Sequence, residues 1–542
     1  MGGPTKLANL SEAVTIALEP GTVRILFVAD GAISFGEDGF GLGRVIDTLN
    51  DTSDPDFPGY TRFAVTTAHR ATPYGGTADL NHFRFTPEAL AGYHEVWLFG
   101  WDGFPPGSGA GASLGADEVS ALTQFMNRRH GGVFAAGDHM SMGLTLCGLV
   151  PRVRNMRKWW FDQTGTPLPP GESNAPSYAD HTCNDTVQPP VPGSDPNTGT
   201  QGDGTPQPIW PTLYPRGPFH SVGPRWLYPH PVLCGPRGQI RVLPDHPHEG
   251  ECRLPFDLSQ TLIDGSPEYP GGVEPEIIAH ASTVAGRVTE APMASPESGG
   301  VVLEARRFPV LCAYDGHSDG ADVGRVLVDS SWHHWVNLNL VGLDAVGGDA
   351  WADVRAYYRN VALWLAPPGV RRHMSMTALM KARYSIELVE LLAGRGQPLQ
   401  ASLIGVGERA RDALGRLAPR CERAIFLLDE VRALRPTLWR RINPWDPLVP
   451  EDSPRRGSEI EATARDLVLT AVLGGIVAEI AASLPEAHRM KAADLEPRFD
   501  EVAARGARAG LAEAERLLEG DLAAVATIVT ELEPHAAGAR AS

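Results

Sequence analysis

The chain has 542 residues, 42% of them hydrophobic, and a formal net charge of −18 at pH 7. One hydrophobic core rarely serves so long a chain, so we expect at least two domains. The negative charge argues against nucleic acid as a partner, because non-specific binding to it requires a positive surface. The 6 cysteines include no C-x-x-C pair, which argues against a zinc ribbon or a disulfide framework and favours reduced thiols in the cytoplasm.

Membrane attachment is not predicted. Residues 1–21 form an N-terminal segment that contains charged side chains and lacks the unbroken apolar region of a signal peptide. The most apolar run, 467–484, approaches the length of a membrane span but contains Glu479. We therefore expect a helix buried in a helical domain. Its Gly474 and Gly475 would let another helix approach closely, within the chain or between subunits.

Strand patterns alternate with helical patterns in the first part of the chain. Short apolar runs predict strands at 23–29, 62–67, 94–100 and 132–136, and helical patterns lie between them at 44–49, after Thr86 and at 115–130. This alternation is typical of a parallel sheet with helices on both faces. We therefore predict an α/β fold with a doubly wound parallel sheet.

The alternation then breaks. Residues 162–230 are rich in Pro, Gly, Asn, Asp and Thr, and we expect an inserted cover over the sheet. Strand patterns resume at 239–243, 277–288, 301–314 and 325–329, and a helical pattern follows at 349–366. Long helical patterns dominate the remainder. We assign residues 22–368 to the α/β domain, 371–534 to an all-helical domain and 535–542 to a tail.

Polar side chains follow several predicted strands. Asp30 and Asp102 each come at or shortly after a strand end, and Asp138 and His139 follow the strand at 132–136. In an open α/β sheet, the loops after the strands form the crevice where ligands bind. Asp138 and His139 are therefore candidate catalytic residues, the alternative for Asp138 being a cap of the next helix. Asp30 and Asp102 would bind substrate hydroxyls or only close tight turns.

Histidines cluster in two later segments. His246, His248 and Glu249 lie close together, and alternate residues of an extended chain project to one face. They predict a divalent metal site in which Glu249 orients a ring or acts as a base, the alternative being a hydrogen-bonded loop over the pocket. His333 and His334 follow a late strand. Because neighbouring side chains cannot face the same way, we expect one of the two to face the crevice.

A basic and aromatic segment follows the first candidate site. Arg152, Arg154 and Arg157 lie close to Trp159 and would bind an anion or the face of a sugar through bidentate and stacking contacts. The alternative is a solvated amphipathic helix. The glycine-rich segment 36–43 matches neither common phosphate-binding motif, so no nucleotide cofactor is expected.

The order of five short motifs resembles a known superfamily. The motifs are VRILFVAD, HEVWLFGWDG, GGVFAAGDHMSMG, VLPDHPHEGEC and GRVLVDSSWHHWVNLNL. Together they resemble the class I glutamine amidotransferase-like superfamily, in particular its ThuA-like (trehalose-utilisation-like) branch. The resemblance implies a flavodoxin-like sheet for the α/β domain and does not extend to the helical domain.

The resemblance also implies where chemistry would lie. The amidotransferases place a cysteine nucleophile at the turn that Gly137, Asp138 and His139 occupy here, and the nearest thiol, Cys147, comes later. Glutamine hydrolysis is therefore not expected, since it needs a thiolate at that turn. A histidine after a late strand assists the nucleophile in the family. His333 or His334 is the corresponding residue, and His334 is preferred.

Two hypotheses of function follow. In the first, the chain is a hydrolase or lyase that acts on a small polar substrate, a sugar derivative or an amide. Asp138, His139, Glu249 and His334 would supply acid–base or metal-assisted chemistry. In the second, the fold is a non-catalytic module whose helical domain mediates homo-oligomerisation or binds a partner protein. The missing cysteine favours the module, and the costly polar groups at several strand ends favour the enzyme, which we prefer.

Overall fold

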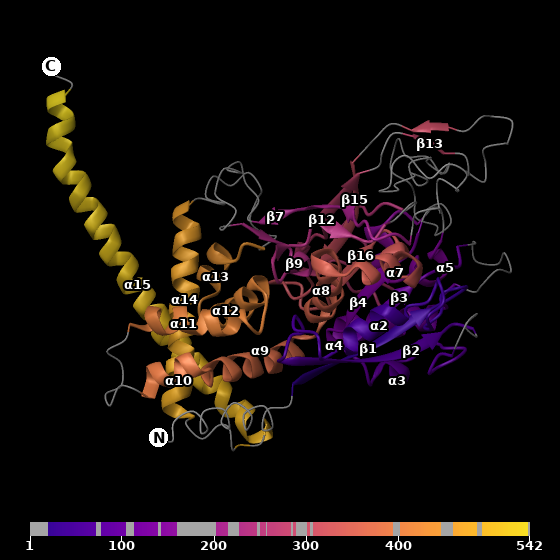
Figure 1. The fold of residues 1–542 in the computed structure, drawn as a ribbon, viewed down its shortest axis with the longest axis horizontal. Coiled ribbons are helices and arrows are strands. Elements are labelled where there is room, and N and C mark those ends of the chain that lie inside the picture. Colours follow the sequence, from indigo (N-terminus) through magenta and orange to yellow (C-terminus); the bar gives the residue numbers. More distant parts are fainter. Residues whose placement is uncertain are drawn as a thin grey trace. The chain divides into compact units, whose positions relative to one another are not determined.

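The structure of the chain is a computed structural model. It describes residues 20–71, 77–103, 113–138, 142–159, 202–214, 227–245, 250–255, 257–282, 286–288, 301–303, 307–393, 402–445, 459–484, 490 and 492–539. The chain forms two compact units (Figure 1). The first comprises Gly21–Tyr214 and Tyr228–Arg371, and the second comprises Met1–Pro20, Pro215–Leu227 and Arg372–Ser542. An α/β unit is therefore followed along the chain by a helical one, as the sequence predicts.

An eight-stranded sheet organises the α/β unit, in the order β2-β1-β3-β4-β16-β15-β12-β6. Its strands are β1 (Gly21–Ala29), β2 (Thr61–His69), β3 (Glu95–Phe99), β4 (Gly132–Ala136), β6 (Trp210–Pro211), β12 (Glu276–Ser282), β15 (Arg307–Tyr314) and β16 (Val326–Asp329). The strands from β2 to β16 in this order are parallel, and β15, β12 and β6 are antiparallel to their neighbours. The sheet is thus mixed, whereas the sequence pattern suggested a purely parallel one.

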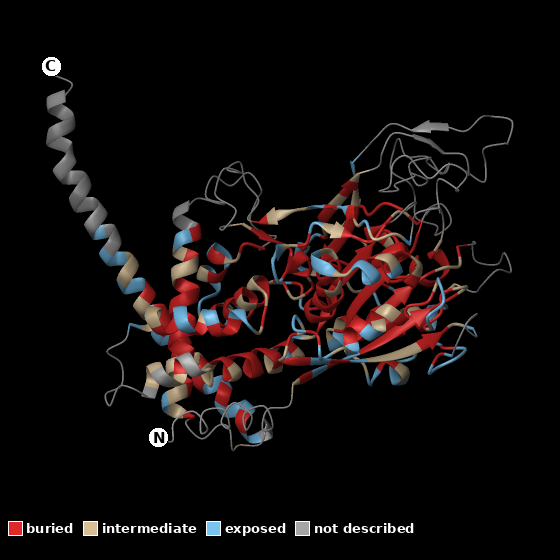
Figure 2. Cartoon of the chain, in the orientation of Figure 1, coloured by how far each residue is buried: buried red, intermediate tan, exposed pale blue. Residues whose placement is uncertain are grey.

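Helices cover both faces of the sheet (Figure 1). They are α2 (Gly43–Asn50), α3 (Pro87–Leu90), α4 (Ala116–Arg129), α5 (Leu144–Cys147), α6 (Val153–Met156), α7 (Asn337–Val346) and α8 (Gly348–Leu365). Apolar side chains of α4, among them Phe125, pack on the face that Val96 and Val133 present. On the other face, Trp97 and Phe134 contact Trp335. Because the central strands are covered on both sides, their residues are almost continuously apolar and buried (Figure 2).

Shorter strands and 3-10 helices complete the α/β unit. They are β5 (Gln207–Pro208), β7 (Leu213–Tyr214), β8 (Tyr228–Pro229), β9 (Cys234–Gly235), β10 (Gly238–Gln239), β11 (Val242–Leu243), β13 (Gly286–Val288), β14 (Val301–Leu303), η4 (Pro231–Leu233), η5 (Pro270–Gly272) and η7 (Trp332–His334). The described part of the expected insertion contributes the edge strand β6. The pattern at 239–243, expected to be one strand, is divided between the small sheets of β9 with β10 and of β5 with β11.

Closely packed helices form the second unit. They are α10 (Ile386–Ala393), α11 (Leu403–Gly415), α12 (Arg420–Leu434), α13 (Pro436–Ile442), α14 (Glu459–Ser483) and α15 (Ala492–Ala539), preceded by α9 (Pro368–Arg383). Gly474 lies against the backbone of α11, and Gly475 against Gly506 of α15. A side chain at either position would overlap that backbone, so the glycine pair allows close helix approach within the chain.

The stretch Ala462–Ser483 of α14 is, among the described helices, long and apolar enough to cross a membrane by length and composition alone. This criterion is weak evidence, because the core helix of a water-soluble domain also meets it. Here 61% of its most apolar window is buried inside the structure. The apolar residues of α14 are therefore accounted for by packing on α11 and α15.

Candidate functional site

The ends of β4 and β16 bring the candidate residues together. These strands are parallel neighbours, with Ala136 opposite Asp329 in the register. The chain beyond β4 therefore runs beside the chain beyond β16, and the Trp332 N–H donates to the Gly137 carbonyl at 2.8 Å. This places Asp138 beside η7 at the carboxyl edge of the sheet, where α/β proteins commonly bind ligands.

His333 pairs with Asp138. Its Nε2 lies 3.0 Å from Asp138 Oδ2, and the two side chains are 2% and 0% exposed. On the other side of the ring, His333 Nδ1 lies 3.0 Å from Asn339 Oδ1. The Asn339 amide is oriented because its Nδ2 donates to the Asp245 carbonyl at 2.7 Å. Asn339 Oδ1 can only accept, so Nδ1 of His333 carries a proton.

The other ring nitrogen lies close to a carboxyl group. His333 Nε2 and Asp138 Oδ2 are at ion-pair distance, and they attract each other when the ring is protonated and the carboxyl group is ionised. A buried imidazole in contact with a carboxyl group has the composition required of an acid–base group.

His334 belongs to a different network. Its Nδ1 lies 2.7 Å from Asp329 Oδ1, and both side chains are fully buried. Three more donors converge on the same carboxylate, namely the N–H of Ser331, Nε1 of Trp335 and the hydroxyl of Tyr357. Because these groups converge on one carboxyl group, Asp329 fixes the turn that carries both histidines.

Arg157 holds the two chain segments against each other. Its guanidinium donates to the carbonyl groups of Asp138 and Ser330, and the N–H of Gly250 donates to the same Ser330 carbonyl. The guanidinium also lies 4.3 Å from the centre of the Trp159 ring. Arg157 and Trp159 are fully buried. Their role in the structure is thus to position the backbone of the site.

Arg152 and Arg154 are bound to a buried glutamate. Nε of Arg152 donates to the Glu268 carbonyl at 2.8 Å, and Nη2 of Arg154 lies 2.6 Å from Glu268 Oε2. Arg152 is fully buried, and the side chain of Arg154 is 31% exposed. The sequence left two alternatives open, a substrate-binding patch and a solvated amphipathic helix. In the structure, Arg154 pairs with the carboxylate of the buried Glu268 and the Arg152 side chain binds its backbone carbonyl, a partner that sequence reasoning had not considered.

Asp30 follows β1 and binds the turn that follows the neighbouring strand β3. Its Oδ1 accepts from the backbone N–H groups of Trp101 and Asp102, and its Oδ2 lies 2.9 Å from the Thr145 hydroxyl. Burial, and secondarily the charge of Asp102, raises the pKa of Asp30 to about 7. Burial also raises the pKa of Asp102, which is half-buried. The sequence left two roles open for Asp30, binding of substrate hydroxyls and closure of a tight turn. The observed contacts are those of turn closure.

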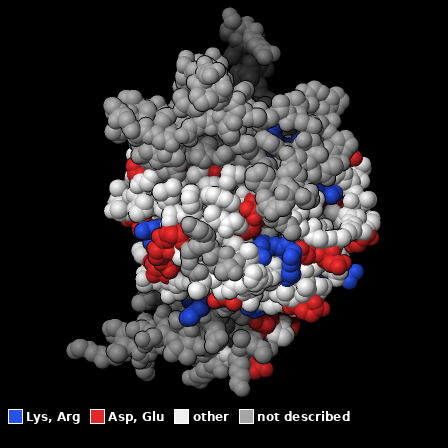
Figure 3. Space-filling view, turned by 90° about the vertical axis from the view of Figure 1, so that its right-hand side faces the viewer, with Lys and Arg blue, Asp and Glu red and all other residues white. Residues whose placement is uncertain are grey.

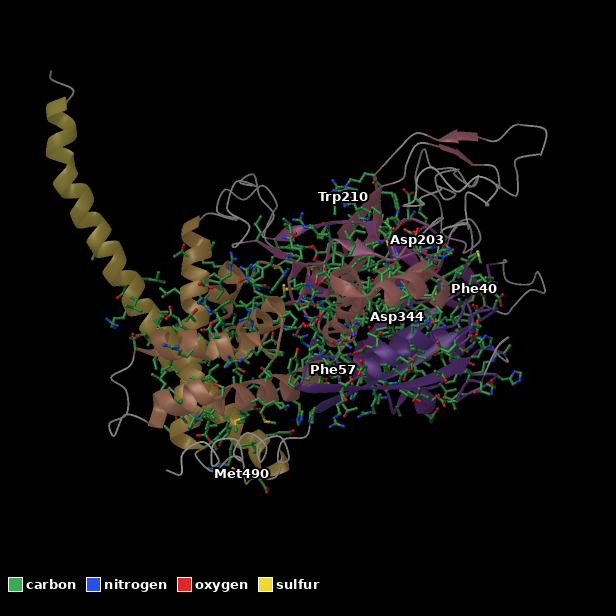
Figure 4. All side chains as sticks on the ribbon, in the orientation of Figure 1. Phe40, Phe57, Asp203, Trp210, Asp344 and Met490 are labelled. Carbon is green, nitrogen blue, oxygen red and sulfur yellow. The ribbon has the colours of Figure 1, made fainter. Side chains whose placement is uncertain are left out.

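An aromatic stack borders the pair of Asp138 and His333. The Trp332 ring stacks on Trp101, with centroids 5.1 Å apart, and lies 4.1 Å from the His333 ring. Phe40, labelled in Figure 4, meets Trp101 and Trp332 edge-on. Phe40 and Trp101 are partly exposed, whereas Trp332 is buried. Stacked rings therefore run from the surface down to His333.

Four of the predicted site residues, His139, His246, His248 and Glu249, lie outside the described residues. Within the described ranges, no group of three or more His, Cys, Asp and Glu side chains is arranged to hold a metal ion. Cys147 is buried in α5, 3.8 Å from the Ala136 carbonyl, and burial raises its thiol pKa well above the usual value. This sulfur is therefore not a thiolate nucleophile.

A separate hollow of about 420 Å³ lies beside α4 and α6. Its lining is mostly apolar, formed by Leu114, Ala116, Val119, Leu149, Pro151, Arg154, Thr261, Leu262 and Ile263. Neither Asp138 nor His333 lines the hollow.

On the face drawn in Figure 3, the described Lys and Arg side chains are interspersed with Asp and Glu.

No match identifies a family. The sequence matches no protein-family model and no curated protein, and the chain matches no solved structure. The candidate site therefore rests on the geometry of this chain alone.

Sequence reasoning missed two contributors. Asn339, which orients the His333 ring, had a weak signal, since it and Asn337 are amides between the apolar residues of the segment VNLNL. Tyr357, which donates to Asp329, lies 28 positions away from it in the sequence, and no local pattern links the two.

Proposed function

We propose that the α/β unit is a flavodoxin-like, amidotransferase-like domain. The parallel part of its sheet has the order β2-β1-β3-β4-β16, which corresponds to the 2-1-3-4-5 order of flavodoxin-like folds. The helices on both faces also support this assignment. The antiparallel strands β15, β12 and β6 then extend the sheet beyond its fifth parallel strand.

For the function, we propose a hydrolase or lyase that acts on a small polar substrate by acid–base chemistry. The observation that carries this proposal is the 3.0 Å contact of His333 Nε2 with Asp138 Oδ2, combined with the Asn339 contact that fixes the ring tautomer. An imidazole beside a carboxyl group at a strand end can give a proton to a leaving group or take one from water. Asp138 and His333 are the proposed acid–base pair, and His334 acts through Asp329 as a positioning residue.

The metal-assisted form of this hypothesis requires His246 and His248. Elemental analysis of the purified chain beside a His246→Ala, His248→Ala variant tests it separately. Stoichiometric metal in the parent protein that is lost in the variant is the result expected of a metal hydrolase or lyase. The acid–base proposal for Asp138 and His333 does not depend on the outcome.

A turnover screen tests the enzyme proposal. Small amides, esters, glycosides and hydroxy acids would be offered to the wild-type chain and to the Asp138→Asn and His333→Gln variants. We expect turnover of at least one class, with kcat reduced by about 100-fold or more in each variant, the usual size of an acid–base contribution. An Arg237→Ala variant, which alters an exposed ion pair with Asp353, is the matched control and should keep its activity.

A non-catalytic module is the second candidate. It is favoured by the burial of Asp138 and His333 and by the burial of Cys147. In that case, the helical unit would mediate homo-oligomerisation or bind a partner protein. The absence of turnover across the whole panel, together with a specific partner or oligomer of the helical unit, would replace the enzyme proposal. Under either proposal we expect a cytoplasmic chain that binds no nucleic acid.

A further inference from the structure

Two buried hydrogen-bond donors beside the candidate pair lack acceptors. Neither the hydroxyl of Ser330 nor Nε1 of Trp332 has a hydrogen-bond partner among the residues that the structure describes. Ser330 is fully buried and Trp332 is 2% exposed. A buried polar group without a partner costs free energy, so each such group requires a physical explanation, and a bound ligand that supplies the missing partner is one.

Both donors belong to the segment that packs on Asp138. Arg157 bridges the carbonyl groups of Asp138 and Ser330, which keeps these two residues close together. The backbone N–H of Trp332 donates to Gly137, and its ring lies 4.1 Å from the ring of His333. Each donor is thus in a residue that is bound directly to the candidate site.

The neighbouring residues of the same two types each have a hydrogen-bond partner. The hydroxyl of Ser331 accepts from the His333 N–H at 3.1 Å, and Nε1 of Trp335 donates to Asp329 Oδ2 at 3.0 Å. The turn therefore gives a partner to one serine and one tryptophan and leaves the side-chain polar atoms of the other serine and tryptophan without one among the described residues. This difference within a six-residue segment is not explained by burial, which all four side chains share.

We propose that Ser330 and Trp332 are substrate-binding residues that donate hydrogen bonds to an uncharged acceptor oxygen, such as a carbonyl oxygen. An indole N–H can only donate, so the ligand atom must accept. The carboxyl groups of Asp102, Asp138 and Asp329 make the same edge of the sheet unfavourable for an anionic ligand, and the nearby guanidinium of Arg157 is already bound to the carbonyl groups of Asp138 and Ser330. This inference deepens the proposed function by naming the chemistry of its ligand, and its test needs no turnover.

Thermal unfolding separates the two serines, whose substitution by alanine changes the packing least. We expect Ser331→Ala to lower the melting temperature by about 2–4 °C, because it removes a formed hydrogen bond. Ser330→Ala should leave it within about 1 °C or raise it, because it removes a hydroxyl without a partner. An equal loss in the two variants would show that the Ser330 hydroxyl is satisfied within the folded chain and would overturn the proposal.

Ligand binding can be measured at the Trp332 indole N–H by NMR. In 15N-labelled protein, the Trp332 Nε1–H signal would be assigned by its absence from Trp332→Phe and followed during titration with acetamide. We expect a downfield shift of this signal, no shift of the Trp335 signal, and weaker binding in Ser330→Ala. Acetate, the charged counterpart, should bind at least about 10-fold more weakly. An unmoved Trp332 signal, or preference for acetate, would refute the assignment whether or not the enzyme proposal holds.

Discussion

The adjacent His333 and His334 have different partners and therefore different chemical roles. His333 contacts Asp138 and Asn339, whereas His334 contacts Asp329, which already accepts several donors. His333 Nε2 lies at ion-pair distance from Asp138, while His334 Nδ1 is hydrogen-bonded to the carboxyl group that fixes the turn. The motif WHHW indicates that the two rings diverge, but it does not indicate which ring meets Asp138. That outcome depends on Asn339 and on the pairing of β4 with β16.

The contact of Asp138 with His333 should appear as a coupling energy. We expect Asp138→Asn and His333→Gln each to destabilise the α/β unit by about 2–4 kcal/mol, because each leaves a buried partner unpaired. The double variant should lose less than the sum, with a coupling of about 1–3 kcal/mol. Urea unfolding of the four proteins measures this cycle. Simple additivity would mean that the two side chains do not interact.

Asp30 should make stability depend on pH. The hydroxyl of Thr145 has one hydrogen but lies within bonding distance of both Asp30 Oδ2 and the Asp102 carbonyl, so a protonated Asp30 that donates to Thr145 satisfies every contact. The pKa of Asp30 is raised from 3.8 to about 7, so the folded state binds this proton more tightly. Its contribution is fully present below pH ~4 and is lost as pH rises through about 7, by on the order of 4 kcal/mol.

The Asp30→Asn variant tests this interpretation. An asparagine amide can donate to Thr145 and accept from the backbone N–H groups of Trp101 and Asp102 without titrating. Thermal unfolding between pH 5 and 8 should therefore show the wild-type protein losing stability relative to the variant as pH rises. A stability difference that stays constant across this range would show that Asp30 is ionised throughout.

At the scale of elements, strand alternation was readable from the sequence, whereas strand pairing was not. The apolar runs that become β1, β3 and β4 were predicted close to their observed bounds. Strands β4 and β16 are neighbours although they lie roughly 200 positions apart in the sequence, and no local pattern predicts this pairing. The strands β12 and β15 overlap predicted strand patterns, but their antiparallel direction was not readable, because a short buried strand has the same composition in either direction.

Replacing glycine with alanine should have opposite effects on stability at one position in α14 and at one in α15. Gly475→Ala should destabilise the helical unit by about 2–3 kcal/mol, because the added Cβ would overlap the backbone at Gly506. Gly520→Ala in α15 has open space around it and should stabilise the helix by about 0.5–1 kcal/mol. Calorimetry of both variants checks the signs. A stabilising Gly475→Ala would mean that α14 and α15 are not closely packed.

At the scale of the whole molecule, composition and pattern were enough to predict an α/β unit followed by a helical one. The helical pattern of the second unit was clear because its apolar residues recur with helical spacing. Its packing through Gly474 and Gly475 was one of two alternatives that the sequence left open. The arginine segment shows the limit of such reasoning, because the burial of Arg152 depends on Glu268, a residue far from it in the sequence.

The most direct measurement is the protonation of the His333 ring nitrogens, by NMR of the protein labelled with 15N in its histidine imidazoles. His333 would be assigned through the His333→Gln variant. The account predicts that Nδ1 carries a proton from pH 6 to 8, because Asn339 can only accept there, and that the Nε2 signal changes in Asp138→Asn. An unprotonated Nδ1 at neutral pH, or an Nε2 signal that does not change in Asp138→Asn, would contradict the pairing of His333 with Asp138 on which the proposed function depends.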